Sequence, residues 1–181
     1  EFFIDSKQNG RITIGKSVSQ VQQGYYFAGV IGFVHEIGMY PVLAKQIHLP
    51  MQSGDDKVLI RMNRKHNMEK YCHIVQTIRK LIPEATLFTD GIVGFTGETE
   101  EQFANTQKAF HEFKFNMSYT AIYSPRPGAT SHRWVDDIPQ DEKKRRLHAL
   151  TEDLREHSLP YNQALIGKTM RVLVRGVDRK E

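Results

Sequence analysis

Four polar or small residues lie where apolar segments end, and their types suit the binding of a small polar ligand. Gln52 and Ser53 follow one short apolar run, and the Gln52 side chain carries both a hydrogen-bond donor and an acceptor. Asp90 and Gly94 belong to the end of a second apolar run. Because glycine has no Cβ, a ligand can approach the backbone closely at Gly94. The alternative for residues 52 and 53 is a strand-ending turn in which Ser53 caps the next helix.

The basic residues suggest a second chemistry, contact with an anionic partner. Arg126 stands between two prolines, which restrict the backbone and leave the guanidinium less freedom to lose on binding. A surface salt bridge is the alternative for this residue. Lys168, Arg171 and Arg175 lie in an alternating segment, where they can face phosphates or keep an exposed strand edge soluble. The run at 143–146 (KKRR) shares a predicted helix with acidic residues, so we expect a solvated helix face there.

Composition narrows the possibilities further. The 25 Lys and Arg exceed the 21 Asp and Glu by a margin that permits an RNA partner without requiring one. The single cysteine, Cys72, cannot form a disulfide framework or hold an iron–sulfur cluster, which needs several thiolates. The histidines have no metal-ligand spacing, so we expect no metal site in this chain. We also expect no catalytic residue in it. The apolar stretches are too short to span a bilayer, and we expect a cytoplasmic protein.

Alternating strands and helices must position these residues. A helix beginning after Asn67 has a good N-cap, and Thr99 with Gln102 has the spacing of a capping box. The near-continuous apolar strands between helices predict an α/β fold with parallel strands. The strands are expected at 46–49, 86–93 and 118–124, and the helices at 55–64, 67–82 and 98–113.

The ends of the predicted strands are marked by glycine and proline at 50–54, 94–98 and 124–128. In parallel α/β folds, ligands bind at the carboxyl ends of the strands. We therefore expect the segments that carry Gln52, Gly94 and Arg126 to meet at one rim.

The two ends of the chain are less regular. Residues 11–14 alternate like a strand, and residues 24–34 are rich in aromatic and β-branched types, which predicts a buried strand. A long helix is expected over 139–165, with three leucines on its buried side. Alternation at 168–174 predicts a last strand, and because a lone strand is unstable it would begin a small β domain.

Four motifs follow one another along the chain: HLPMQSG at 48–54, MNR at 62–64, TDGIVGFTGETEE at 89–101 and YSPRPG at 123–128. Together they resemble the methylthiotransferase family of radical-SAM enzymes. The resemblance extends from about residue 48 to about residue 175. Within it, the SPRPG run resembles the branch of the family that acts on N6-dimethylallyladenosine in tRNA. Gly91, where an aliphatic residue is common, and Pro160, inside the predicted long helix, depart from the family pattern.

The resemblance implies a domain organisation. Residues 41–138 would be the later βα units of a radical-SAM partial barrel, residues 139–165 a connecting helix, and residues 166–181 the start of an RNA-binding TRAM domain. Residues 1–40 stay unassigned, with a divergent barrel segment as one interpretation. In the family, a three-cysteine loop after the first barrel strand binds a [4Fe–4S] cluster, and that loop is absent from this chain.

The resemblance also implies roles for individual residues. S-adenosylmethionine (SAM) would lie against the strand ends, and tRNA would contact the basic residues. Glu98 lies one position late for the superfamily pattern Gly-x-Ile-x-Gly-x-x-Glu, so we interpret it as an acidic residue at a helix N-terminus. The implied cofactor residues are Gln52, Ser53, Asp90 and Gly94, and the implied RNA contacts are Arg126, Lys168, Arg171 and Arg175.

The implied activity is the transfer of a methylthio group to N6-dimethylallyladenosine next to the anticodon. SAM would serve as methyl donor and as radical source, and [4Fe–4S] clusters would be held by parts of the intact protein outside this chain. The chain alone would be inactive, and the intact protein a monomer with an unassigned sulfur donor. A family member that modifies a ribosomal protein or another tRNA adenosine derivative, and a non-catalytic RNA-binding fragment, are the alternatives.

Overall fold

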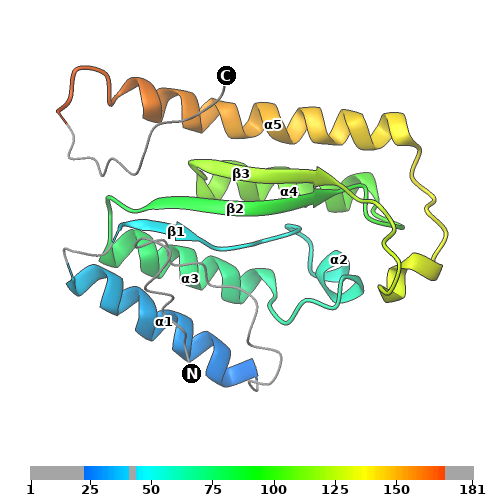
Figure 1. Ribbon diagram of the computed structural model, residues 1–181, viewed down its shortest axis with the longest axis horizontal. Helices are drawn as coiled ribbons and strands as arrows, with labels where there is room; N and C mark the ends of the chain where they lie inside the picture. Colours follow the sequence, from blue (N-terminus) through cyan, green and yellow to red (C-terminus); the bar gives the residue numbers. More distant parts are fainter. Residues whose placement is uncertain (1–22, 41–43, 170–181) are drawn as a thin grey trace, which may run out of the picture.

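The computed structural model describes residues 23–40 and 44–169, and its centre is a sheet of three parallel strands (Figure 1). The strands are β1 (Gln46–His48), β2 (Thr86–Val93) and β3 (Met117–Ile122), and their order in the sheet is the order in the sequence. Both neighbouring pairs are parallel. The predicted α/β class with parallel strands is confirmed, and the three strands agree with a partial radical-SAM barrel.

Helices connect the strands as the caps in the sequence predict. Asn67 accepts a hydrogen bond from the Lys70 amide, and the Thr99–Gln102 capping box is complete. These side chains satisfy backbone N–H groups that the first helical turn leaves without partners. The helices are α2 (Asp56–Arg61), α3 (Met68–Leu81) and α4 (Glu100–Phe113).

One face of the sheet packs against these helices. Ile47, Leu87 and Val93 are fully buried in the same core as residues of α3 and α4. The Tyr71 hydroxyl of α3 donates to the Leu49 carbonyl at 2.7 Å, which ties the helix to the end of β1. Since side chains alternate along a strand, His48 and Asp90 point to the opposite face, called the inner face below.

The segment at 24–34 is helical, so the prediction of a buried strand there is wrong. It belongs to α1 (Gln23–Met39), which packs against α3. Val34 and Ile37 are buried one helical turn apart, and Ile31 packs against the same core. Packing of this helical stripe overrides the local preference of β-branched residues for strands.

A long helix, α5 (Gln140–Gln163), follows a 3₁₀ turn, η1 (Thr130–Arg133). It starts near the carboxyl ends of the strands and runs back beside β3 toward their amino ends (Figure 1). Its length is about 36 Å at about 1.5 Å per residue. Leu150 is its fully buried contact with the core, and the helix continues through Pro160.

The predicted last strand falls mostly beyond the described residues. Lys168 follows a turn at Gly167 and belongs to no strand, while residues 170–174 lie outside the described part, as do residues 11–14. The domain boundaries at 41, 139 and 166 stay predictions. None of the helices within 23–40 and 44–169 is long and apolar enough to cross a membrane.

Candidate functional site

The carboxyl ends of the three strands lie along one edge of the sheet. Past β1, the Gln52 amide donates to the Asp90 carbonyl at 2.8 Å, and the Ile92 amide donates to the Gln52 carbonyl at 2.9 Å. On the other side of β2, the Tyr123 amide donates to the Val93 carbonyl at 2.9 Å. The segments that lead into Gln52, Gly94 and Arg126 therefore leave the sheet at the same rim, as expected from parallel strands.

Gln52 has an unusual backbone conformation at this rim. Its φ is +71°, in the left-handed region that residues other than glycine rarely adopt. The residue is 7% exposed, and its side-chain oxygen accepts a hydrogen bond from Arg64 Nη2 at 3.0 Å. Backbone strain of this kind costs about 1–3 kcal/mol and collects at functional sites. The cofactor-binding role of the Gln52 side chain stays a prediction.

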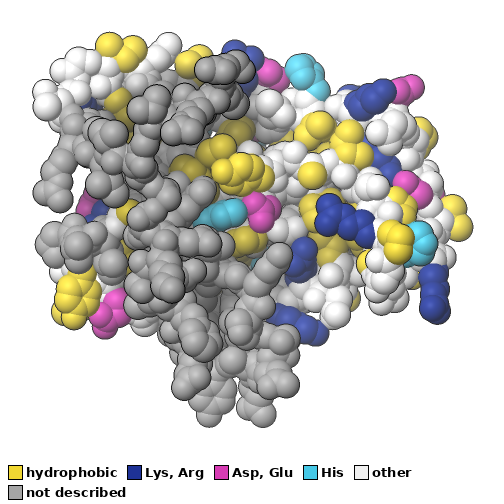
Figure 2. All heavy atoms as spheres, viewed as in Figure 1, with side chains coloured by type: hydrophobic (Ala, Val, Ile, Leu, Met, Phe, Trp, Pro, Cys, Tyr) yellow, Lys and Arg dark blue, Asp and Glu magenta, His cyan; other side chains and the backbone are white. Residues whose placement is uncertain are grey.

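A polar row crosses the inner face next to Gln52. The His48 Nε2–H donates to Asp90 Oδ1 at 2.8 Å, and the His48 ring lies 5.8 Å from the Tyr119 ring. The Asp90 carboxylate raises the pKa of Arg64, although the stronger effect of burial keeps that pKa below its usual value. In the view of Figure 2, a histidine and an acidic side chain touch near the middle of the surface, with hydrophobic side chains above and below them.

The sequence argument missed three members of this row. His48 and Arg64 were named only as parts of motifs, and Tyr119 was assigned no role. In the sequence, the polar His48 stands next to the apolar Leu49, and this alternation indicates that His48 lies on the inner face. The contacts with Asp90 and Gln52 join residues on separate elements, which no local pattern encodes.

Ser53 lies on the other side of the strand end. It is fully buried, its hydroxyl accepts from the Asp55 amide at 3.2 Å, and it lies 3.3 Å from Thr106 Oγ1 of α4. The cap of α2 is Asp55, which accepts from the amides of residues 57 and 58, so the alternative in which Ser53 caps that helix is wrong. Ser53 holds the turn against α4 and does not face the polar row.

Gly94 is held by protein groups on two sides. Its φ is +69°, and a Cβ at this position would overlap the Lys143 side chain of α5. Its amide donates to Glu98 Oε2 at 2.7 Å. Glycine is therefore required here for packing against α5. The cofactor role of Gly94 stays a prediction.

Glu98 precedes α4 and forms a buried ion pair. It is 3% exposed, and Arg146 Nη1 donates to both Glu98 Oε2 and the Glu98 carbonyl at 2.9 Å. Burial raises the pKa of the Glu98 carboxyl, while the Gly94 hydrogen bond and Arg146 act in the opposite direction. The helix-terminus interpretation of Glu98 is therefore incomplete, because Oε2 of its carboxylate is engaged by both Arg146 and the Gly94 amide.

The run at 143–146 is only half solvated. The Lys144 and Arg145 side chains are exposed, as predicted, but Lys143 and Arg146 are 1% and 5% exposed. The prediction of a solvated face is wrong for these two residues because α5 turns them toward the ends of β2 and β3.

The predicted RNA contacts do not all lie together. Arg126 is exposed in a turn beyond β3, where its carbonyl accepts from the Ala129 amide at 3.1 Å. Lys168 is exposed beyond the far end of α5, a helix about 36 Å long that starts near the rim. Arg171 and Arg175 lie outside the described residues. The RNA-binding roles stay predictions, with Arg126 the one placed beside the rim.

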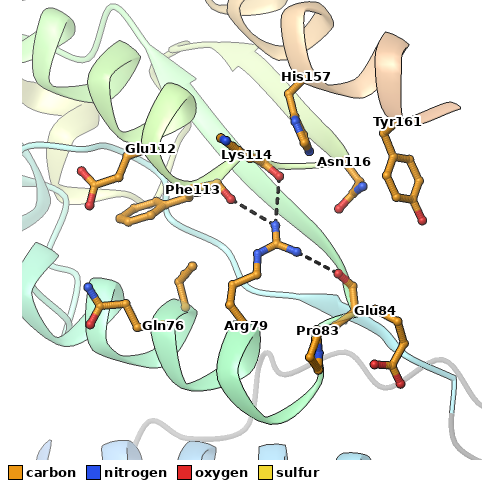
Figure 3. A pocket seen from close by; sticks show the side chains of 12 residues that line it. Gln76, Arg79, Pro83, Glu84, Glu112, Phe113, Lys114, Asn116, His157 and Tyr161 are labelled. Atoms are coloured by element: carbon orange, nitrogen blue, oxygen red, sulfur yellow. Dashed lines mark hydrogen bonds between the residues drawn. The ribbon is translucent and has the colours of Figure 1, made fainter. Parts of the chain in front are cut away.

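A cavity of about 730 Å³ lies at the opposite edge of the sheet, between α3, α4 and the end of α5 (Figure 3). Arg79 occupies its middle and donates to the carbonyls of Ala85, Phe113 and Lys114. These three hydrogen bonds hold the start of β2 and the end of α4 together. The arginine is thus engaged in the fold, and the cavity is far from the polar row.

Within residues 23–40 and 44–169, no group of His, Cys, Asp and Glu could hold a metal ion. Cys72 lies on α3, where burial and the neighbouring Glu112 raise the pKa of its thiol. A raised pKa disfavours the thiolate, which is the form that binds iron.

His66 should make the free energy of unfolding depend on pH. Its Nε2–H donates to the Met51 carbonyl at 3.1 Å, and burial, aided by Arg64, lowers its pKa. The unfolded chain therefore binds a proton more readily, so stability falls as pH drops from about 6.5 to the lower folded pKa. A His66→Gln variant should lose this slope, at most about 1.4 kcal/mol per pH unit.

Denaturant unfolding of the intact protein between pH 5 and 8 measures the effect. His73→Gln, which replaces an exposed histidine of α3, is the control. Parallel curves for wild type and His66→Gln would contradict the prediction.

Residues 32–110 match the family model described as Radical SAM superfamily, and the three parallel strands agree with a partial barrel of that class. The match begins at residue 32, so it includes part of α1.

Relatives make the assignment more specific. Three relatives carry the name tRNA-2-methylthio-N(6)-dimethylallyladenosine synthase. The protein of Ehrlichia chaffeensis is 46% identical over 70% of this chain, that of Thermus thermophilus 42% over 82%, and that of Cronobacter sakazakii 41% over 77%. The predicted resemblance to the radical-SAM methylthiotransferases is confirmed. The aligned part covers 29%, 32% and 30% of these relatives, so the chain spans about a third of their length.

Proposed function

We propose that this chain is part of a tRNA methylthiotransferase that adds a 2-methylthio group to N6-dimethylallyladenosine next to the anticodon. The observation that carries the proposal is the polar row at the strand ends, in a chain 41–46% identical to enzymes of that name. The intact protein would use SAM as methyl donor and radical source.

The residues of the polar row fit the polar groups of SAM. The side-chain oxygen of Gln52 accepts from Arg64, so its side-chain N–H₂ group is the part that can donate to the carboxylate of SAM. Asp90 has a second carboxylate oxygen besides the one bonded to His48, and that oxygen can accept from a hydroxyl. His48 and Arg64 keep these two side chains oriented from either side, which lowers the entropy lost on binding. Ser53 contributes indirectly by holding the turn.

The iron–sulfur clusters do not fit this chain. One cysteine with a raised pKa cannot supply the thiolates of a [4Fe–4S] cluster. In the proposed enzyme, the cluster ligands would come from other segments of the intact protein.

On the RNA side, Arg126 is the first residue we assign. Arg126 is exposed and follows the carboxyl end of β3 by four residues, so it leaves the sheet on the side of the rim at which SAM would meet the adenine. Arginine binds phosphate in a bidentate manner and stacks on bases. Lys168, Arg171 and Arg175 would contact the tRNA from the proposed TRAM segment, which starts near residue 166.

The test uses the intact protein, prepared anaerobically. Gln52→Ala should weaken SAM binding about tenfold, the effect of losing about 1.4 kcal/mol of hydrogen bonding. Equilibrium dialysis with SAM measures the affinity, and Lys57→Ala, at an exposed position of α2, is the control. Equal affinity in the Gln52→Ala variant would remove Gln52 from the site.

Nucleoside mass spectrometry of tRNA tests the substrate. Cells that lack the gene should lose 2-methylthio-N6-dimethylallyladenosine and regain it with the wild-type gene. Unchanged tRNA would favour the alternative in which the enzyme modifies a ribosomal protein. We also propose a monomeric, cytoplasmic enzyme.

A further inference from the structure

Two cations in the first two turns of α5 are buried, and nothing in the proposed function uses them. Lys143 is 1% exposed and Arg146 is 5% exposed. Burying a charge is costly unless it is paired and hydrogen-bonded. Both cations lie beside the loop that follows β2, so their contacts indicate what they do there.

Lys143 connects the ends of two strands. Its methylene groups fill the space that a Cβ would occupy at Gly94, after β2. Its ammonium group donates to the Tyr123 carbonyl, after β3, at 3.3 Å. The same nitrogen pairs with the Asp136 carboxylate at 2.5 and 2.7 Å, and this pairing compensates the buried charge.

Arg146 also contacts the loop that follows β2, through Glu98. It pairs with Glu98, whose Oε2 also accepts from the Gly94 amide at 2.7 Å. The Lys143 side chain therefore packs against the Cα of Gly94, and Glu98 accepts a hydrogen bond from the Gly94 amide. The other carboxylate oxygen, Glu98 Oε1, is buried without a hydrogen-bond partner among the described residues.

We propose that Lys143 is a positioning residue that sets the place of the β2 end, residues 93–98, against the cofactor. This inference rests on the proposed function, because it takes SAM to lie along that strand end. The contacts of Lys143 are with Gly94, the Tyr123 carbonyl and Asp136, so it acts on the strand ends through Gly94 and Tyr123. The connecting helix is then part of the cofactor site and not only a link to the next domain.

The central variant is Lys143→Met in the intact protein. Methionine keeps an unbranched apolar chain against Gly94 but loses the bonds to Tyr123 and Asp136. We expect the Kd and KM for SAM to rise about tenfold, while kcat at saturating SAM stays within about twofold, because the reacting groups are untouched. Lys144→Met, at the exposed neighbouring position, should match the wild type.

Asp136→Asn is a milder second variant, since Asp136 lies in a partly exposed loop. It leaves the lysine in place and removes the charge that holds it, and should raise the Kd for SAM about threefold. Thermal unfolding of each variant is recorded alongside equilibrium dialysis with SAM.

The outcomes are distinguishable. A lower melting temperature with unchanged SAM affinity in both variants would overturn the positioning role and leave Lys143 as a support of the fold. Failure of the wild-type protein itself to bind SAM would overturn the proposed function. A rise in Kd confined to Lys143→Met and Asp136→Asn supports the inference.

Discussion

Replacing Arg146 with leucine should lower the free energy of unfolding by about 3–5 kcal/mol, the usual cost of removing one partner of a buried ion pair. The loss leaves Glu98 as an uncompensated charge at 3% exposure. It also removes the cation that lies 5.4 Å from the centre of the buried Phe103 ring. Denaturant unfolding of the intact protein at neutral pH measures the change.

The deficit of Arg146→Leu should shrink as the pH is lowered. Burial already raises the pKa of Glu98, and loss of Arg146 removes two influences that lower it. The folded state then binds a proton more readily than the unfolded state, so acidification relieves the penalty until about pH 4.3, where the unfolded carboxyl is also protonated.

Two controls separate the pair from the surrounding charges. Arg145→Leu removes an exposed cation with partners Glu100 and Glu142 and should cost less than about 1 kcal/mol. The double variant Arg146→Leu/Glu98→Gln should recover part of the loss. A single Arg146→Leu effect no larger than that of Arg145→Leu would show that the pair is energetically neutral.

Gly54→Ala should cost about 3 kcal/mol, at the upper end of the range for overpacking. A Cβ at Gly54 would lie 2.6 Å from the Asn105 carbonyl oxygen and 2.6 Å from the Thr106 Cα. These are backbone atoms of α4, which cannot move aside as a flexible side chain can. Either the turn after β1 or the whole helix must shift.

The same substitution should impair the site, because Gly54 is two residues from Gln52. We expect a lower melting temperature together with weaker SAM binding in the intact protein. Gly32→Ala is the matched control: its Cβ would meet nothing within 4 Å in α1, and it should be neutral or stabilising by up to about 1 kcal/mol. Equal stability of Gly54→Ala and wild type would contradict the close approach.

Local patterns predicted most of the described elements. The Asn67 cap and the capping box at Thr99 are contacts between residues three positions apart, so the sequence contains both partners. The strand at Thr86–Val93 is bounded by turn residues and was predicted at the same positions. The segment at 24–34 was predicted wrongly because its apolar residues suit a strand or a buried helix, and packing on α3 decided between them.

The sequence by itself determined the βα alternation, the family resemblance and the chemical types available at the strand ends, since these depend on order and spacing along the chain. Only the tertiary structure decided that His48, Asp90, Arg64 and Gln52 form one row, and that Lys143 and Arg146 are buried. The physical reason is distance along the chain: His48 and Asp90 are 42 residues apart, and Glu98 and Arg146 are 48 apart. Such pairs form only when parallel strands and α5 pack, and no local pattern carries that information.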